Sequence, residues 1–427
     1  MKALRRRSGA AANRVRSAAL NLADRIGGPG LWHGRTPLPK TPEATNIALV
    51  GCGFVADFYG FNLRMHPELR LVGMFDLDRT RAERLAAAHG GRVYGSLDEL
   101  LGDPAVQIVV NLTNPASHHA VSRAALLAGK HVYSEKPLGW TVEEAADLVA
   151  TADRQGLLLS CAPCTHLGPS LQALRRAVEE GRIGRPRLVY AELDDGPIHR
   201  MGPDTWESPS GIPWPWRDEF KVGCTIEHAA YHVSWMVMLF GRVESVSATA
   251  TSLLPAKHPD LPQAEVAADL SIAVLRFESG VIARLTCSIV ASHDHSLRVI
   301  GEEGELSIGE IWHIDAPVRL RRFTDIGLRA ASYGWIGHRP FLSRLLGSDG
   351  RSVGRNARGL RSRLRRHEID YALGIAELAA AVRGGPEPIL SGQLALHVNE
   401  IVLAIARADK AGTVVRMSSD HPPRDSV

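Results

Sequence analysis

The stretch VGCGFVADFYG, residues 50–60, restricts the possible folds of this chain more than any other segment. It begins at the end of NIALVG, a short apolar run rich in β-branched residues, and it opens a predicted helix. Gly51, Gly53 and Ala56 occupy the small-residue positions of the pattern G-x-G-x-x-G/A. The first position permits a tight turn, the second lets the backbone approach a pyrophosphate, and the third packs helix on strand. Because a helix N-terminus favours phosphate, this stretch predicts a dinucleotide-binding βαβ unit.

An acidic residue supports this interpretation and bears on the choice of cofactor. Asp76 lies about 20 residues after Ala56, at the end of the second predicted strand, where a carboxylate can accept hydrogen bonds from an adenosine ribose. It would repel a 2′-phosphate, which favours NAD, although Arg79 nearby keeps NADP open. Phe54 and Val55 complete the predicted cofactor-binding loop. A glycine-rich structural turn is the alternative.

Strand-like and helical segments alternate through the first part of the chain. The predicted strands are 46–51, 69–78, 106–113, 131–135 and 157–162. The predicted helices between them include 79–89, 117–128 and 141–155. Such alternation is typical of a parallel, doubly wound sheet, so residues 45–165 are predicted to form a Rossmann domain.

The second half, residues 166–420, has a different texture and predicts a substrate and oligomerisation domain. Several strand-like runs follow one another directly: 186–194, 243–253, 268–278, 280–290 and 295–309. Meander order predicts a large open, mainly antiparallel sheet. Helices are predicted at 169–181, 226–240, 369–383 and 395–412. The predicted fold class is therefore α/β, a Rossmann domain followed by a second α/β domain.

The charge is unevenly distributed. The net charge is +4, but residues 1–40 carry +8 and residues 317–367 carry +11, so the rest of the chain carries −15. We interpret residues 1–44 as a basic, flexible leader, with a possible amphipathic helix at 10–26, and about 317–367 as an Arg-rich, partly irregular insertion. Solvated segments explain both, and attraction to a membrane surface, an acidic polymer or a phosphorylated substrate is the alternative. We do not expect nucleic-acid binding.

Two compositional features bear on location. No run of about 18 apolar residues occurs, so stable membrane insertion is not expected. The basic N-terminus lacks the continuous apolar core of a secretory signal. The five cysteines are odd in number and scattered, which favours free thiols in a reducing compartment and predicts a cytoplasmic protein.

The stretch YSEKPLG, residues 133–139, ends the fourth predicted strand, at the edge of the sheet where ligands bind. An ammonium group at Lys136 would lie beside the nicotinamide and could polarise a substrate hydroxyl or help carry its proton. Glu135 would hold this lysine or line the cofactor pocket. Pro137 fixes the turn, where a cis bond is possible. A surface lysine after a strand is the alternative.

The helix predicted within GCTIEHAAYHVSWMVMLFG, residues 223–241, carries the second group of candidates. His228 and His232 are four residues apart and share one face. We predict that His232 is the general base, because the pKa of a histidine lies near 7. Glu227 and Tyr231 are candidate substrate contacts. The chain lacks the Glu of H-E-x-x-H, so no metal is predicted, and buried core histidines remain an alternative.

The preceding loop, SPSGIPWPWRDEF at residues 208–220, adds two weaker candidates. An aromatic face at Trp216 and a guanidinium at Arg217, next to Asp218, suit sugar binding. A packed Pro/Trp loop explains the same residues equally well.

Taken together, the motifs resemble the Gfo/Idh/MocA family, the proteins like glucose–fructose oxidoreductase and inositol dehydrogenase. Besides GCGFVA and the 223–241 helix, TNPASHHAVSRAALLAGKHVYSEKPLG and HLGPSLQALRRAVEEGRIGRP carry the resemblance. It covers roughly 46–312 and 367–420. It implies a Rossmann domain, an open sheet often used for oligomer contact, NAD or NADP, and a sugar or polyol substrate. A homo-oligomer, dimer or tetramer, is therefore expected.

The resemblance also implies roles for single residues. Lys136 corresponds to the catalytic lysine, and His232 to the histidine of the Asp-x-x-x-His pattern. Three residues correspond to a segment that lines the nicotinamide side: Asn114, Pro115 and His118. Two positions depart from the family: His228 stands where an Asp is usual, and His166 where an Arg or aromatic residue is often found, so altered substrate contacts are expected.

The leading hypothesis is an NAD(P)-dependent oxidoreductase that transfers hydride between nicotinamide and a hydroxyl carbon of a sugar, an inositol or a nucleotide-linked sugar. Arg355, Arg358 and Arg361 are the reason to keep phosphorylated or nucleotide-linked sugars open. A non-catalytic NAD(H)/sugar sensor is one alternative, because the Asp is missing at 228. A hydrolase or epimerase that uses bound NAD in a redox-neutral cycle is another, and a metal enzyme is a third.

Overall fold

A computed structural model describes residues 37–337, 339, 341–342, 351–353, 369–408 and 413–419. The amphipathic helix predicted at 10–26 lies outside these ranges, as do Arg355, Arg358 and Arg361.

The N-terminal sheet has six parallel strands in the order β3-β2-β1-β4-β5-β6. Its strands are β1 (Thr45–Val50), β2 (Leu69–Phe75), β3 (Arg92–Val93), β4 (Ile108–Asn111), β5 (His131–Ser134) and β6 (Leu159–Cys161). Its helices are α3 (Phe54–Leu63), α4 (Arg79–His89), α5 (Leu97–Gly102), α6 (His118–Leu127) and α7 (Val142–Gln155). The strand order reverses between β1 and β4, which creates the crevice where such sheets bind ligands.

Local sequence explains why these helices start and stop where they do. Asp78 caps α4 by accepting a hydrogen bond from the backbone N–H of Thr80. Thr141 caps α7 in the same way, accepting from Glu144, and Gly156 ends that helix in the left-handed conformation with φ 63°. Among the strands and α-helices of this domain, β3 and α5 were not predicted, because a strand of two residues and a helix of six are too short to show a periodicity.

The second sheet has nine strands in the order β14-β13-β12-β11-β7-β10-β9-β8-β15. They are β7 (Pro186–Asp194), β8 (Val243–Thr251), β9 (Leu270–Phe277), β10 (Ile282–Ser288), β11 (Leu297–Gly301), β12 (Gly304–Ile308), β13 (Val318–Arg322), β14 (Arg351–Val353) and β15 (Val414–Arg416). Every pair is antiparallel except β7 with β10. The α/β fold class is confirmed in both halves.

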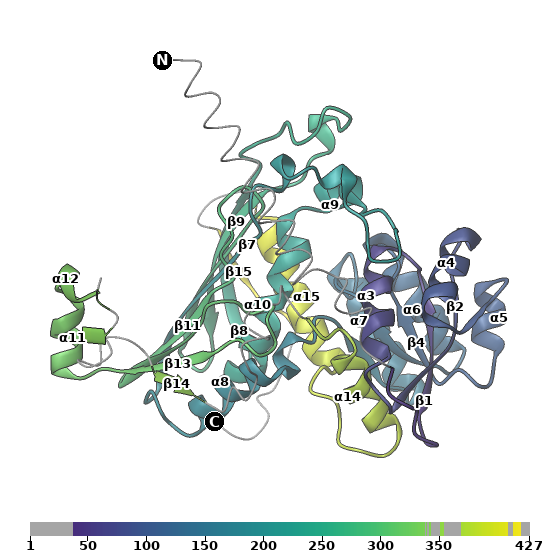
Figure 1. The fold of residues 1–427 in the computed structure, drawn as a ribbon, viewed down its shortest axis with the longest axis horizontal. Coiled ribbons are helices and arrows are strands. Elements are labelled where there is room, and N and C mark those ends of the chain that lie inside the picture. Colours follow the sequence, from purple (N-terminus) through teal and green to yellow (C-terminus); the bar gives the residue numbers. More distant parts are fainter. Residues whose placement is uncertain are drawn as a thin grey trace.

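Helices between the two sheets form the middle layer (Figure 1). α10 (Cys224–Phe240) and α15 (Gly392–Ala406) pack on each other. α15 also contacts β8 of the second sheet and α7 of the Rossmann domain. Other α-helices of this half are α8 (Pro169–Glu179), α9 (Trp216–Val222) and α14 (Leu373–Val382). Short 3₁₀ turns are η1 (Pro115–Ser117), η2 (Thr165–Leu167), η3 (Ile198–Arg200), η4 (Pro203–Thr205) and η5 (Gln263–Glu265).

The segment between β7 and α10 reaches across to the Rossmann domain. The Ser210 backbone N–H and hydroxyl donate to the buried carboxylate of Asp57 on α3, at 2.6 and 2.7 Å. Arg84 on α4 donates to the carbonyl of Gly211 at 2.8 Å. These contacts hold the loop before α9 over the N-terminal end of α3.

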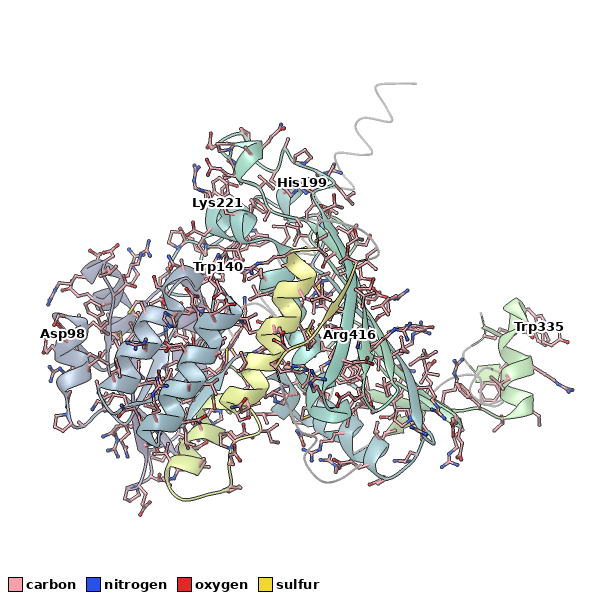
Figure 2. All side chains as sticks on the ribbon, turned by 180° about the vertical axis from the view of Figure 1, so that it is seen from behind. Asp98, Trp140, His199, Lys221, Trp335 and Arg416 are labelled. Atoms are coloured by element: carbon pink, nitrogen blue, oxygen red, sulfur yellow. The ribbon has the colours of Figure 1, made fainter. Side chains whose placement is uncertain are left out.

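The Arg-rich segment is more regular than predicted over its described residues. It contributes β13 and β14 to the second sheet and forms α11 (Asp325–Ala331) and α12 (Gly334–Gly337) between them. Figure 2 shows Trp335 on this helical projection, standing away from the sheet, and its side chain is 62% exposed. Among the residues that the structure describes, no helix is long and apolar enough to cross a membrane.

Candidate active site

The glycine-rich loop after β1 has the geometry that its sequence predicts. Gly51 has φ 93°, and a Cβ there would lie 2.6 Å from the carbonyl carbon and oxygen of Leu112, on the loop after β4. A Cβ on Gly53, the N-cap of α3, would instead meet nothing within 4 Å. The first glycine is therefore required by the close approach of two loops. The second leaves an open hollow at a helix N-terminus, which fits a pyrophosphate.

Asp76 lies beside this hollow at the end of β2. Its Oδ2 accepts a hydrogen bond from the Cys52 backbone at 2.7 Å, and its Oδ1 accepts from the Asp78 backbone at 2.8 Å. Each carboxylate oxygen has a further lone pair for a ribose hydroxyl. Arg79 is engaged by Glu83 at 2.7 Å, so its guanidinium is already paired. These residues fit NAD.

The turn after β4 is pinned to the turn after β5. His118 is buried, and its ring nitrogens lie 2.7 Å from the Pro137 carbonyl oxygen and 2.9 Å from the Thr113 carbonyl oxygen. This is a positioning contact between loops. Asn114 and Pro115, at the start of η1, lie closer to the surface of the same turn.

Lys136 follows β5 directly, and the Lys136–Pro137 bond is cis. The Glu135 carboxylate accepts hydrogen bonds from the Lys136 backbone N–H at 2.9 Å and from the Tyr59 hydroxyl at 2.8 Å. The side chain of Lys136 points elsewhere: its ammonium donates to Oε2 of Glu227, on the first turn of α10. A residue predicted as a secondary substrate contact is therefore the direct partner of the predicted catalytic lysine.

Electrostatics keeps this pair charged. Burial opposes the charge on Lys136, but Glu227, Glu135 and Glu219 outweigh it and raise the pKa of the lysine above its ordinary range. Burial would raise the pKa of Glu227, but Lys136 lowers it. Glu219, on α9, is hydrogen-bonded to Glu227, and burial and the Glu227 charge raise its pKa well above the usual value. The site therefore combines the Lys136 ammonium and the Glu227 carboxylate with a second carboxyl group whose pKa is raised.

Tyr231 lies one helical turn after Glu227, on the same face of α10. Its ring centroid is 5.2 Å from that of Trp312, and its side chain is largely buried. Burial, then Tyr371, Glu135 and Glu227, raise its pKa well above the ordinary value. Tyr231 therefore keeps its hydroxyl proton, and the charges of Glu135 and Glu227, the two acids that bond to Lys136, act on it.

The position of His232 corrects the prediction that it is the general base. It is fully buried, its Nε2 donates to the Glu192 carbonyl oxygen at 3.0 Å, and its Nδ1 accepts from the Trp235 indole at 3.1 Å. Burial lowers its pKa to about 4. A neutral imidazole with both nitrogens occupied inside the core has no atom left for a substrate.

The other predicted histidines, His228 and His166, make no hydrogen bond to Lys136 among the described residues. The Nε2 atom of His228 lies 3.5 Å from the Asp195 carboxylate, and burial lowers the pKa of this histidine. His166, in η2, is fully buried, and neither ring nitrogen has a hydrogen-bond partner among the described residues. Burial lowers its pKa to about 3, so it is neutral.

Trp216 and Arg217 form a group of their own at the outer side of α9. The Arg217 guanidinium lies 4.4 Å from the centre of the Trp216 ring, which itself lies 4.2 Å from the His258 ring. Arg217 donates a hydrogen bond to the Asp260 carbonyl oxygen at 2.7 Å. The Arg217–Asp218 pair that the sequence suggested is therefore replaced by this contact. The packed-loop alternative describes both residues better than sugar binding.

Sequence reasoning missed Glu219, Tyr371 and Trp312, which adjoin this site. Glu219 lies in the loop segment 208–220, where the tryptophans were the candidates. Nothing in that local sequence indicates that its carboxyl group is buried beside Glu227. Tyr371 and Trp312 come from distant segments, and nothing in their local sequence indicates that they reach α10.

Comparison with known proteins decides which family this architecture represents. A model described as an oxidoreductase family with an NAD-binding Rossmann fold matches residues 45–162, and a model of the GFO/IDH/MocA C-terminal domain matches residues 171–307. The chain belongs to the Gfo/Idh/MocA family. This Gfo/Idh/MocA chain is therefore an NAD-binding oxidoreductase of the kind that its motifs resemble.

Its relatives include enzymes that act on different hydroxyl compounds. The bovine trans-1,2-dihydrobenzene-1,2-diol dehydrogenase is 29% identical over 267 residues, which covers 61% of this chain and 73% of the bovine one. The WlbA dehydrogenase of Bordetella pertussis, solved with NADH and UDP-GlcNAcA, has a TM-score of 0.66 at 21% identity and covers 90% of this chain and 100% of its own. The UDP-N-acetylglucosamine 3-dehydrogenase GnnA of Acidithiobacillus ferrooxidans has a TM-score of 0.62 at 19% identity, covering 86% and 98%.

Proposed function

We propose that this Gfo/Idh/MocA protein is an NAD-dependent dehydrogenase that interconverts a secondary alcohol and a ketone on a sugar, a cyclic polyol or a nucleotide-linked sugar. The observation that carries the proposal is the Lys136 ammonium, held charged by Glu227 on the helix face that also carries Tyr231, at the ligand-binding edge of the Rossmann sheet. This largely buried site offers a positive charge and, on the same helix face, a hydroxyl that can donate a proton.

The roles of the residues follow from their charge states. A bound nicotinamide supplies or accepts the hydride. The Lys136 ammonium stabilises negative charge on the substrate oxygen, where a preorganised charge in a buried site acts most strongly. In carbonyl reduction the Tyr231 hydroxyl donates its proton to that oxygen and becomes a phenolate, and alcohol oxidation starts from that phenolate, which takes the proton of the substrate hydroxyl. Glu227 keeps the lysine protonated throughout.

Glu227 also bears on the alternative of a non-catalytic sensor. That alternative rested on the missing carboxylate at 228. The Glu227 carboxylate pairs with Lys136, so a carboxylate accompanies the lysine from the neighbouring position. The argument for a sensor therefore loses its basis, and turnover is the reading we favour.

The experiment that tests the proposal is a turnover screen. Purified protein is mixed with NAD or NADP and with inositols, free hexoses, sugar phosphates, nucleotide sugars and cyclic diols, and nicotinamide absorbance is followed in both directions. We expect NAD to be used with at least one of these classes. Tight NAD binding with no reduction or oxidation by any class would overturn the proposal in favour of a sensor or a redox-neutral enzyme.

Two glycines provide a matched test of cofactor binding. Gly51→Ala is expected to lower the melting temperature by several degrees, because it forces positive φ on alanine and brings its Cβ to 2.6 Å from Leu112. Gly53→Ala is expected to leave the melting temperature unchanged, because its Cβ meets open space. It should nevertheless weaken NAD binding by about tenfold or more, since that space is where a pyrophosphate approaches the backbone. Calorimetric titration of NAD and thermal unfolding check both variants. Unchanged NAD affinity in Gly53→Ala would contradict this placement of the pyrophosphate.

The two acids beside Lys136 should respond differently to amide substitution. Glu227→Gln removes the carboxylate that raises the pKa of Lys136, while burial continues to lower it, so the lysine should lose its proton at a lower pH. The alkaline limb of the pH–rate profile is therefore expected to move to lower pH. Glu219→Gln is the comparison, because Glu219 raises the pKa of Lys136 less than Glu227 and Glu135 do and its own pKa is raised, so a smaller shift is expected. Equal shifts in the two variants would rule out this division of roles.

We further propose a cytoplasmic homo-oligomer. All five cysteines are buried free thiols, which suits a reducing compartment. On the second sheet, β9 alternates buried and exposed positions, and its outward Ile272 and Val274 remain apolar. Exposed apolar side chains such as these two on an outer sheet face favour contact with a second copy of the chain. Light scattering of the purified protein measures the oligomer number, and a monomer at all concentrations would exclude this arrangement.

A further inference from the structure

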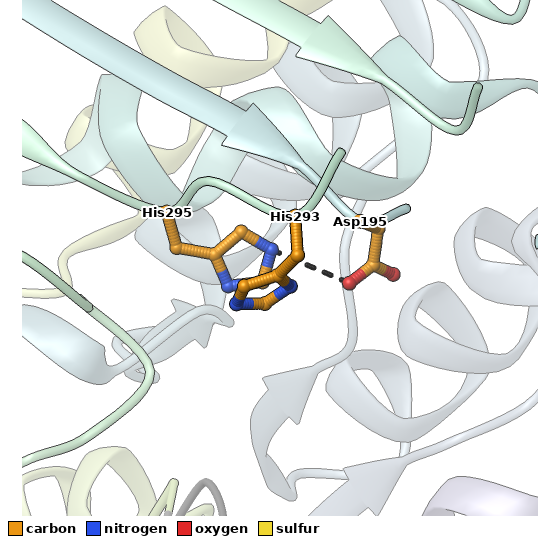
Figure 3. A group of neighbouring side chains, drawn as sticks. All are labelled: Asp195, His293 and His295. Carbon is orange, nitrogen blue, oxygen red and sulfur yellow. Dashed lines mark ion pairs between the residues drawn. The ribbon is translucent and has the colours of Figure 1, made fainter. Parts of the chain in front are cut away.

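A second group of polar side chains lies next to the dehydrogenase site, and none of its members has a role there so far. Asp195 directly follows β7, and His293 and His295 lie in the segment between β10 and β11. One ligand atom from each of these three residues lies within 4.8 Å of the other two (Figure 3). Figure 3 shows the two imidazole rings side by side and tilted, with a dashed line for the ion pair between His295 and the Asp195 carboxylate.

The spacing of these atoms suits a shared metal ion. His295 Nε2 lies 3.3 Å from Asp195 Oδ1, which is long for a charge-assisted hydrogen bond of about 2.7–2.9 Å. Two ligand atoms that each lie about 2.0–2.1 Å from a tetrahedral Zn²⁺ are about 3.3 Å apart. The pair therefore already has the separation that one ion between them would require.

Glu310, just after β12, orients both imidazoles. Its Oε1 lies 3.0 Å from His295 Nδ1, and its Oε2 lies 2.9 Å from His293 Nε2. Metal-binding histidines commonly donate their second ring N–H to a carboxylate, which fixes the tautomer and the ring orientation. One carboxylate does this here for two histidines, and the opposite nitrogen of His295, Nε2, is the one that lies near Asp195.

Burial gives the cluster a closed side and an open side. The His295 side chain is fully buried, whereas those of Asp195 and His293 are 23% and 43% exposed. Three protein ligands with an accessible side are typical of metal sites that keep a coordination position for water or substrate. Since His228 Nε2 lies 3.5 Å from Asp195, the cluster adjoins the helix that carries Glu227 and Tyr231.

We propose that Asp195, His293 and His295 bind one divalent transition-metal ion of the Zn²⁺ class, with Glu310 positioning the two histidines. Two imidazoles and a carboxylate favour such an ion over Ca²⁺ or Mg²⁺, which prefer all-oxygen sites. This departs from the expectation of no metal, which considered only the His228–His232 pair. The alternative is a ligand-free network of ion pairs among the same four residues.

The test measures metal binding directly, without cofactor or substrate. Full-length protein, freed of any affinity tag and stripped with a chelator, is titrated with ZnCl₂ by calorimetry and with CoCl₂ by visible absorption. We expect one ion per chain and the d–d bands of Co²⁺ with nitrogen ligands. Because turnover is not the readout, failure here would leave the dehydrogenase proposal intact, and failure of that proposal would leave this site intact.

Variants assign the binding to these residues. Asp195→Asn, which keeps the side-chain shape, and His293→Ala, at a partly exposed position, are each expected to weaken Zn²⁺ binding by more than about 100-fold, and Glu310→Gln by about 10–100-fold. His119→Ala is the matched control, since His119 pairs with Asp147 at 2.8 Å on the Rossmann domain and should leave the affinity unchanged. Melting temperatures verify that each variant is folded. No stoichiometric binding by the wild type, or binding that survives both ligand substitutions, would overturn the site in favour of the ion-pair network.

Discussion

Lys136→Met is expected to lower turnover by about 10²–10⁴-fold while NAD binding is largely retained. Methionine keeps most of the volume of the lysine but removes the charge that would stabilise the substrate oxygen. It also leaves Glu227 and Glu219 together without a cation, so the pKa of the Glu227 carboxyl should rise. Steady-state rates on the best substrate of the screen, with calorimetric titration of NAD, measure the two effects separately.

Lys221→Met is the control for this variant. Lys221 lies on the neighbouring α9 and forms an exposed ion pair with Glu265 at 2.6 Å. Its loss should change turnover by less than about twofold, because exposed ion pairs contribute little. Wild-type turnover in Lys136→Met would show that the lysine takes no part in the reaction. Its charge would then act in ligand binding alone.

Tyr231→Phe is expected to lower kcat by about 10²–10⁴-fold without a change in melting temperature. The substitution removes only the hydroxyl, and the ring keeps its packing against Trp312. The pH dependence should change as well, because the variant lacks the group that donates the proton. Rates over a range of pH and thermal unfolding give both results.

His232→Asn provides the opposite pattern. It is expected to lower the melting temperature, because it disturbs the buried hydrogen bonds to Glu192 and Trp235. Its kcat should stay near that of the wild type at a temperature where the variant is folded. A large loss of kcat in His232→Asn together with normal turnover in Tyr231→Phe would restore the histidine as the proton-transfer residue.

Our proposal that Tyr231, and not His232, transfers the proton shows how far the sequence alone can locate such a residue. The motif located α10 and its charged residues correctly along the chain, but a functional face depends on rotation about the helix axis. One residue turns a helix by about 100°, so adjacent positions point into different surroundings. A histidine four residues after another histidine was the stronger chemical signal. Only the contact between Glu227 and Lys136 identifies the face that includes Tyr231.

The Rossmann half was predictable because its signals are local. Gly51, Gly53 and Asp76 act within one βαβ unit, and their roles follow from a turn, a helix end and a strand end. The Asp195–His293–His295 group has no such signal, since about a hundred residues separate Asp195 from the two histidines and the strand order β11-β7-β10 brings them together. Pairing across a sheet of nine strands is a long-range property that no local spacing encodes.

The packing of α15 has a consequence for any attempt to change the cofactor by recombination. Gly392 of this helix faces Val149 and Leu159 of the Rossmann domain, while His397 accepts a hydrogen bond from the Val243 backbone at 2.9 Å at the start of β8. A chimera joined near residue 165 would therefore place a foreign nucleotide-binding half against a helix that evolved with the original one. A functional exchange would have to include residues 392–406 as well. The part that must be exchanged together therefore consists of two segments that are separate in the sequence, the Rossmann domain and α15.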